Sequence, residues 1–107
     1  MRRRATEVNA RDIASLDKVL HEPARLSVVA CLAVVQQADF VFLQSQTGMT
    51  GGNLSSHLRK LEEAGYITIK KSFEDARPKT TLMLTKTGRT ALEAYLKTLS
   101  ALLSAIA

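Results

Sequence analysis

The sequence predicts one mainly α-helical domain that carries a small β-hairpin wing. Apolar residues recur at helical spacing on both sides of the segment "QTGMT", which indicates two helices joined by a short turn. After Gly65 the apolar period changes from 3.6 residues to two, which is typical of strands. A chain of 107 residues with 46% apolar residues suits one domain with one hydrophobic core.

The first helix is expected near the N-terminus. Ile13, Leu16 and Leu20 recur at helical spacing and predict a helix that ends at "HEP", because the residue before Pro23 is disfavoured in the α region. Pro23 can then open a second helix as its first residue. The side of this second helix that is expected to face the core carries Leu26, Val29, Ala30 and Ala33.

The segment "ADFVFLQSQTG" fits two elements in succession. Phe40 to Phe42 suit a short strand, and "FLQSQTG" suits a short helix that Gly48 ends in the left-handed conformation. Thr50 is a favourable N-cap for the next helix, and Gly65 is a favourable residue just beyond its end. The expected order is therefore helix, three-residue turn, helix.

Two strands and a long helix are expected after Gly65. "YITIKKSF" and "KTTLMLT" each place alternate apolar residues on one face, and the polar "EDARP" between them predicts a hairpin loop. Thr85 is a favourable N-cap for the final helix. Apolar residues of that helix are spaced four, three, four and three apart and predict a seam for a partner helix: Leu92, Leu96, Leu99, Leu103 and Ile106.

The helix that begins "TGGNLSSHLRK" has two glycines in its first turn. On a helical wheel Leu54, Leu58 and Leu61 share one face and should point to the core, while the opposite face begins small and polar. Gly51 and Gly52 each cost about 0.5–1 kcal/mol relative to alanine in a helix interior, and less in a first turn. A helix that enters the major groove by its N-terminus needs no bulk there, because bases and phosphates approach closely. Close approach to DNA would offset the cost.

The charge balance favours an anionic partner. The chain has 15 Lys and Arg against 10 Asp and Glu, a net charge of +5 and a pI of about 9.7, which is typical of nucleic-acid-binding domains. Residues 1–12, which include Arg2, Arg3 and Arg4, predict a basic flexible arm, with an arm in the minor groove as the alternative. Residues 13–107 are then expected to form a winged-helix DNA-binding domain with terminal dimerisation helices.

These residues resemble a known family. "MTGGNLSSHLRKLEEAGYI", the basic hairpin and "LTKTG" together resemble a winged helix-turn-helix DNA-binding domain of the MarR/ArsR-like kind, over Leu20 to about Tyr95. The resemblance implies a homodimeric bacterial or archaeal transcription regulator, with Thr50 to Lys60 in the major groove and the wing near Arg77 on the minor groove or backbone. A two-fold dimer implies an inverted-repeat operator in double-stranded DNA. Such regulators often sense a small-molecule effector, whose identity the resemblance leaves open.

Two sets of site residues follow from the wheel, the seam and the resemblance. Asn53 suits the reading of adenine, and Arg59 the reading of guanine or phosphate. The expected DNA-binding residues are Thr50, Gly51, Gly52, Asn53, Ser55, Ser56, Arg59, Lys60, Arg77, Lys79 and Thr80. The expected dimer interface comprises Ile13, Leu16, Leu20, Leu92, Tyr95, Leu96, Leu99, Leu102, Leu103 and Ile106. Arg77 and Lys79 have an alternative interpretation as solubilising residues of an edge hairpin.

Other function classes lack their motifs. The sequence has no phosphate-binding glycine loop and no metal-ligand spacing, and Cys31, His21 and His57 are scattered, so we expect neither an enzyme nor a metal or cofactor site. One cysteine cannot form an internal disulfide, which fits a buried thiol and the cytoplasm. The apolar run "LSVVACLAVV" is far shorter than the roughly 20 residues of a membrane span. The alternative to DNA binding is a winged-helix module that binds protein.

Overall fold

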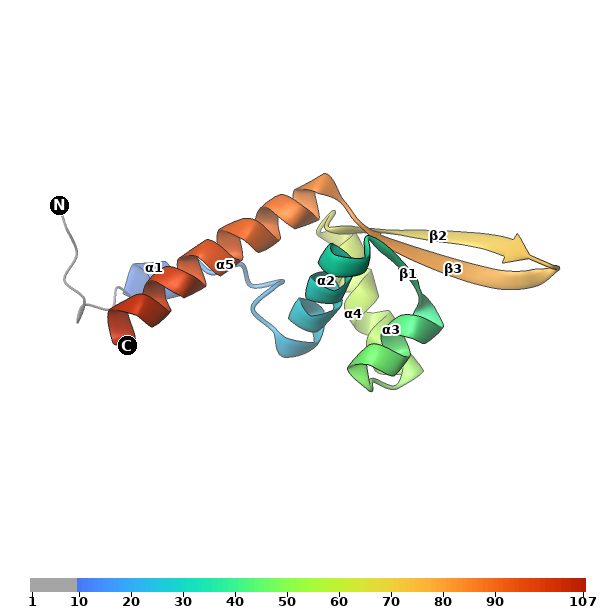
Figure 1. Cartoon of the computed structure of the whole chain (residues 1–107), viewed down its shortest axis with the longest axis horizontal. Helices are drawn as coiled ribbons and strands as arrows, with labels where there is room; N and C mark the ends of the chain where they lie inside the picture. The colour runs from blue at the N-terminus through green and yellow to red at the C-terminus, as the bar shows by residue number, and fades with distance from the viewer. Residues whose placement is uncertain (1–9) are drawn as a thin grey trace.

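The computed structural model describes residues 10–107, in which a hairpin projects from one end of a group of helices (Figure 1). The elements are α1 (Ala10–Ala14), α2 (Pro23–Val35), β1 (Gln37–Asp39), α3 (Phe40–Thr47), α4 (Gly51–Glu63), β2 (Ile67–Glu74), β3 (Arg77–Leu84) and α5 (Lys86–Ile106). The molecule is elongated, at 60 × 25 × 21 Å, because α5 and the β2–β3 hairpin extend in opposite directions. The mainly α fold with a hairpin wing is confirmed.

The helix-turn-helix is formed by α3 and α4, and its ends lie where the sequence predicts them. Gly48 adopts the left-handed conformation at φ 71° beyond α3, and three residues separate the helices. The Thr50 hydroxyl accepts a hydrogen bond from the Asn53 N–H at 3.2 Å and caps α4. Gly65 follows α4 at φ 79°. Pro23 also opens α2 as predicted, with Glu22 as its N-cap.

The three strands form an antiparallel sheet of order β1-β3-β2. The β2–β3 ladder runs from Ile67 opposite Leu84 to Glu74 opposite Arg77. The predicted "EDARP" loop is too long, because the turn consists of Asp75 and Ala76 alone. Both residues have positive φ, at 51° and 63°, as in a type I′ turn. The twist of this turn matches that of the flanking strands, so strand pairing continues to the tip.

The strand predicted at Phe40 to Phe42 lies three residues earlier. β1 is Gln37–Asp39, which pairs with β3, and Phe40 is the first residue of α3. The Asp39 carboxylate accepts a hydrogen bond from the Phe42 N–H at 2.7 Å. This N-cap starts the helix before the aromatic residues, which overrides their preference for strands.

The N-terminal helix is shorter than predicted. α1 ends at Ala14, although Leu16 and Leu20 are both buried in the core. The Asp17 carboxylate accepts hydrogen bonds from the backbone N–H groups of Val19 and Leu20, at 2.8 and 3.1 Å, and so holds a turn where the helix was expected. α1 also begins inside the predicted basic arm, whose residues 1–9 lie outside the described residues.

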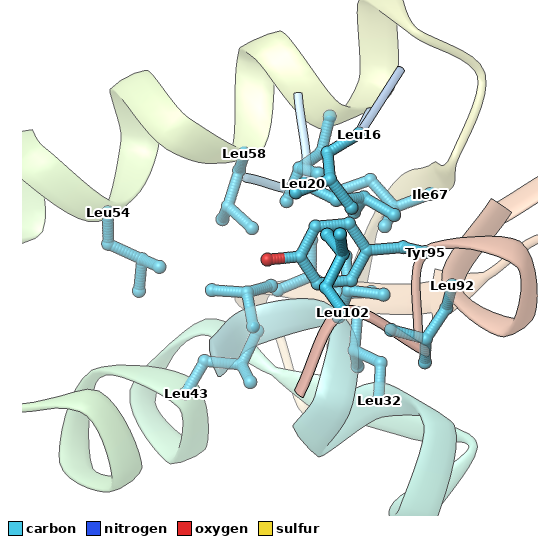
Figure 2. Packing of buried hydrophobic residues seen from close by; sticks show 14 residues of the cluster. Leu16, Leu20, Leu32, Leu43, Leu54, Leu58, Ile67, Leu92, Tyr95 and Leu102 are labelled. Atoms are coloured by element: carbon cyan, nitrogen blue, oxygen red, sulfur yellow. The ribbon is translucent and has the colours of Figure 1, made fainter. Parts of the chain in front are cut away.

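The core lies where α2, α4, the base of the wing and α5 meet, as Figure 2 shows. Its largest fully buried side chains are Leu20, Leu32, Leu43, Leu54, Leu61, Ile67 and Leu82. Tyr95 and Leu102 of α5 belong to the same cluster, and the Tyr95 hydroxyl contacts His21 Nδ1 at 2.9 Å. The core therefore fixes α4, the wing and α5 with respect to one another.

Candidate nucleic-acid interface

α4 presents its polar face to solvent. Leu54, Leu58 and Leu61 are buried beneath the helix, as the wheel predicts. The residues expected to read DNA lie on the outside, where Gly52, Asn53, Ser55, Ser56, Arg59 and Lys60 are all exposed. Their exposure and the capped N-terminus make this face accessible to a large polar ligand.

The two glycines of α4 occupy different environments. A Cβ on Gly51 would lie 3.8 Å from the Gln44 side chain and 3.9 Å from Phe40, at ordinary van der Waals distance. A Cβ on Gly52 would meet nothing within 4 Å. The fold itself therefore requires glycine at neither position.

A cleft of about 770 Å³ opens between α4 and the wing. Arg59 and Ser55 line it from α4, and Lys71 and Thr80 line it from the wing. All four side chains can donate hydrogen bonds, and two are cationic. Glu62 is the acidic residue of the lining. The cleft is half-open and predominantly cationic, which suits a polyanion.

The wing has two faces, because side chains alternate along each strand. Lys71 pairs with Thr80 on the face that lines the cleft. Arg77 and Lys79 lie on the opposite face, since each is an odd number of residues from Thr80. The sequence prediction thus grouped residues from both faces and missed Lys71. The period-two alternation from Ile69 to Lys71 was the signal that could have identified it.

The cations of the wing differ in whether they form an ion pair within the chain. Lys79 Nζ lies 2.7 Å from a Glu74 carboxylate oxygen, and this hydrogen bond and charge raise the pKa of Lys79. Arg77 and Lys71 form no ion pair within residues 10–107. Lys79 is therefore partly neutralised within the chain, whereas the charges of Lys71 and Arg77 are available to a ligand.

His57 lies on the inner side of α4 and holds the helix against the start of α2. Its Nδ1 is 3.3 Å from Arg25 Nη1 and 3.6 Å from a Glu22 carboxylate oxygen. Burial raises the pKa of Glu22, but N–H donors of Arg25 and Ala24 and the charges of His57 and Arg25 lower it overall. The carboxylate is thus kept ionised at a contact that orients α4.

The residues predicted to form a dimer interface divide into two groups. Leu16, Leu20, Leu92, Tyr95 and Leu102 are buried within the chain's own core. Ile13 of α1 is 48% exposed, and Leu99 is half-buried. Leu96, Leu103 and Ile106 are 48%, 58% and 67% exposed. With Leu99 these three residues form a continuous stripe, called here the α5 stripe; the core covers part of Leu99 and leaves the other three exposed.

Further pockets lie on the sheet and beside α5. One of about 350 Å³ is lined by β1 and β3, one of about 560 Å³ lies near the hairpin tip, and one of about 260 Å³ lies between Asp17 and α5. Residues 10–107 contain no group of three or more His, Cys, Asp or Glu side chains that could hold a metal ion. In the same part of the chain, no helix has the length and apolar character needed to span a membrane.

A helix-turn-helix followed by a β-hairpin is the arrangement of a winged-helix domain, and here the cleft between the two carries Arg59 and Lys71. A family model described as a winged helix DNA-binding domain matches residues 24–103. The chain belongs to this family. The resemblance predicted from the sequence is confirmed, and the family consists of DNA-binding domains, not enzymes.

Other proteins are similar to this chain in sequence or in fold. An uncharacterised protein of Methanocaldococcus jannaschii is 35% identical over 79 residues, which are 74% of this chain and 86% of that protein. The structure of a transcriptional regulator homologue from Pyrococcus horikoshii matches with a TM-score of 0.81 and 30% identity, over 87% of this chain and 94% of that chain. BpsR of Bordetella bronchiseptica, whose DNA binding is regulated by 6-hydroxynicotinic acid, shares the fold at 16% identity and a TM-score of 0.69, over 90% and 75% of the chains. MarR- and ArsR-family regulators also share the fold.

Proposed function

We propose that the chain is a homodimeric transcriptional regulator that binds an inverted repeat in double-stranded DNA. α4 enters the major groove by its N-terminal half, and the wing contacts the adjacent minor groove or backbone. The observation that carries the proposal is the cleft between α4 and the wing, where donors from both elements face one space. One strand of the duplex would pass through it, with Arg59 and Lys71 on its phosphates.

Base reading is assigned to the outer side of α4. Asn53 is exposed in the first turn, where side chains reach base edges when a helix enters by its N-terminus. Its amide can form two hydrogen bonds with adenine in the major groove. Ser56 and Arg59, one and two turns further along the exposed face, would contact the next base or the phosphates.

The dimer is assigned to the α5 stripe. The exposed Leu96, Leu103 and Ile106, with the half-buried Leu99 at the intervening turn, form a surface of the 21-residue helix that a second copy could cover. Ile13 of α1 would widen this contact, because α1 packs beside α5. A two-fold pairing places two copies of α4 on one side of the dimer, so half-site centres should lie about 10–10.5 base pairs apart or a multiple of that.

The test is selection of bound duplexes from a random pool, followed by sequencing. The wild-type protein should enrich an inverted repeat. Asn53→Ala should relax preference at one base pair per half-site and weaken the selected site by about 1–3 kcal/mol. Lys71→Ala should instead weaken all duplexes alike and lower the salt-dependence slope by about one. Lys97→Ala, which removes an exposed lysine of α5, is the matched control and should change neither quantity.

The dimer is tested by sedimentation of Leu103→Glu, which places a charge in the α5 stripe without disturbing the core. We expect monomers at micromolar concentration, where the wild type is dimeric. Val34→Glu is the control, because Val34 is 82% exposed at the end of α2. A monomeric wild type would refute the dimer, and a random pool without enriched sequences would favour the protein-binding alternative.

A further inference from the structure

An apolar pair lies near the tip of the wing. Phe73 of β2 stands directly opposite Pro78 of β3, one step from the turn. Phe73 is 76% exposed, and Pro78 is exposed as well. Glu74 and Arg77 flank the two-residue turn as a hydrogen-bonded pair, so Phe73 and Pro78 form the next, non-hydrogen-bonded pair, in which side chains lie closer together.

The pair faces the same way as the cationic cleft. Phe73 is two residues beyond Lys71 on β2, and Pro78 is two residues beyond Thr80 on β3, so strand alternation puts all four on one face. Lys71 and Thr80 line the cleft beside α4. The face of the wing that lines the cleft therefore has an apolar outer end.

We propose that Phe73 and Pro78, called here the wing wedge, enter the minor groove beside each half-site and partly unstack one base step. The inference rests on the proposed function, because it requires α4 in the neighbouring major groove. Apolar side chains that enter the minor groove act in this way and bend the duplex toward the major groove. Lys71 would hold the backbone on the inner side of the wedge.

The charges at the hairpin tip are consistent with shallow entry of the wing wedge into the minor groove. The ion pair with Lys79 partly neutralises Glu74 and weakens its repulsion of the phosphates. Asp75 lies in the turn beyond the wedge, where its carboxylate would oppose deeper entry. Arg77, on the other face of the hairpin, can reach the phosphates across the groove.

The wing wedge and a purely cationic wing predict different preferences for the DNA sequence of the flanks. Arginine in a minor groove favours A-tracts, which are stiff and narrow. A wedge favours pyrimidine–purine steps such as TpA, which unstack most easily. Two flanks of equal A·T content, one an A-tract and one with a TpA step, therefore separate the two mechanisms.

The experiment uses duplexes that carry the half-sites selected from the random pool and differ only in these flanks. Wild type should bind the TpA flank roughly five- to tenfold more tightly than the A-tract, the scale of one unfavourable base pair. Phe73→Ala should reduce this ratio to within about twofold. Val34→Ala removes an apolar side chain that is 82% exposed on α2, and it should leave the ratio unchanged. A 2-aminopurine at the TpA step should brighten with wild type and not with Phe73→Ala.

The outcomes separate this inference from the proposed function. If wild type favours the A-tract, or if Phe73→Ala keeps the TpA preference, the wedge is refuted while DNA binding by α4 stands. If Phe73→Ala weakens both flanks equally, Phe73 only stiffens the hairpin, and the wedge is again refuted. If wild type binds no duplex in a salt-dependent manner, the proposed function itself fails.

Discussion

Replacement of Gly52 by alanine is expected to change the stability of the free protein and its DNA affinity in opposite directions. Gly52 is an exposed residue in the first turn of α4, and its backbone is helical, as alanine prefers. A Cβ there would meet no atom of the chain within 4 Å. Gly52→Ala should therefore stabilise the free protein, although the wild-type sequence keeps glycine.

The size of both effects can be estimated. Alanine is about 0.5–1 kcal/mol better than glycine in a helix interior, so about 0.5 kcal/mol is expected in a first turn, or a rise of roughly 2–4 °C in Tm. If bases and phosphates approach Gly52 closely, the added methyl must displace them. Overpacking of a close contact costs about 1–3 kcal/mol, which is roughly five- to 150-fold in affinity.

Gly51→Ala is the matched control. Its Cβ would contact Gln44 and Phe40 at 3.8–3.9 Å, within the chain and away from the exposed face. The sequence prediction grouped Gly51 with the DNA-binding residues, but because its methyl group would point into the chain, Gly51→Ala should raise Tm like Gly52→Ala and leave DNA affinity unchanged. Thermal unfolding by circular dichroism and fluorescence anisotropy on the selected duplex measure the two quantities. Equal affinity of Gly52→Ala and wild type would refute close approach at the start of α4.

Three further predictions concern stability and charge. A Cβ on Gly88 would lie 2.2 Å from the backbone carbonyl oxygen of Tyr66, so Gly88→Ala should cost at least about 1–3 kcal/mol in thermal or urea unfolding. The Tyr66 hydroxyl donates a hydrogen bond to Asp17, which raises the pKa of Tyr66 to about 12. The raised pKa favours the protonated phenol in the folded state, so this stabilisation is complete below about pH 10 and lost as the pH rises to 12; Tyr66→Phe should remove that part of the pH dependence. Glu62→Gln removes the carboxylate from the cleft and should tighten binding to all duplexes by about two- to fivefold, whereas Glu93→Gln on α5 should not.

Local signals placed most helix ends correctly. Thr50, Gly48 and Gly65 act through their own backbone and side-chain geometry, so their roles could be predicted without knowledge of the tertiary structure. The buried face of α4 was also predictable, because its leucines recur every three or four residues among polar ones. α2 is apolar nearly all round, and its periodicity carried little information. The inner side predicted for it included Ala30, which is exposed, whereas Val28 and Leu32 are buried.

Tertiary contacts account for the other differences. β1 consists of "QAD", which has no strand propensity, and it is a strand because Ala38 pairs with Leu82 of β3. The turn after Ala14 depends on Asp17, whose second carboxylate oxygen accepts from the Tyr66 hydroxyl, 49 residues away in the chain. No local pattern reports such a contact. The cleft is lined by Arg59 of α4 and Lys71 of β2. Which wing residues face Arg59 depends on the strand register, which the sequence prediction did not resolve.

The junction around Thr85 explains how these elements could act together on DNA. The Thr85 N–H donates to the Tyr66 carbonyl at 2.9 Å, and the Thr85 hydroxyl donates to the Gly65 carbonyl at 2.6 Å. The same hydroxyl accepts from the Gly88 N–H at 2.9 Å. The end of α4, both strands of the wing and the start of α5 thus meet at one hydrogen-bonded point, where only glycine fits at residue 88. If α5 pairs two copies, this junction sets the distance from the dimer axis to each α4 and each wing, so the spacing of the half-sites would follow from backbone contacts far from any base.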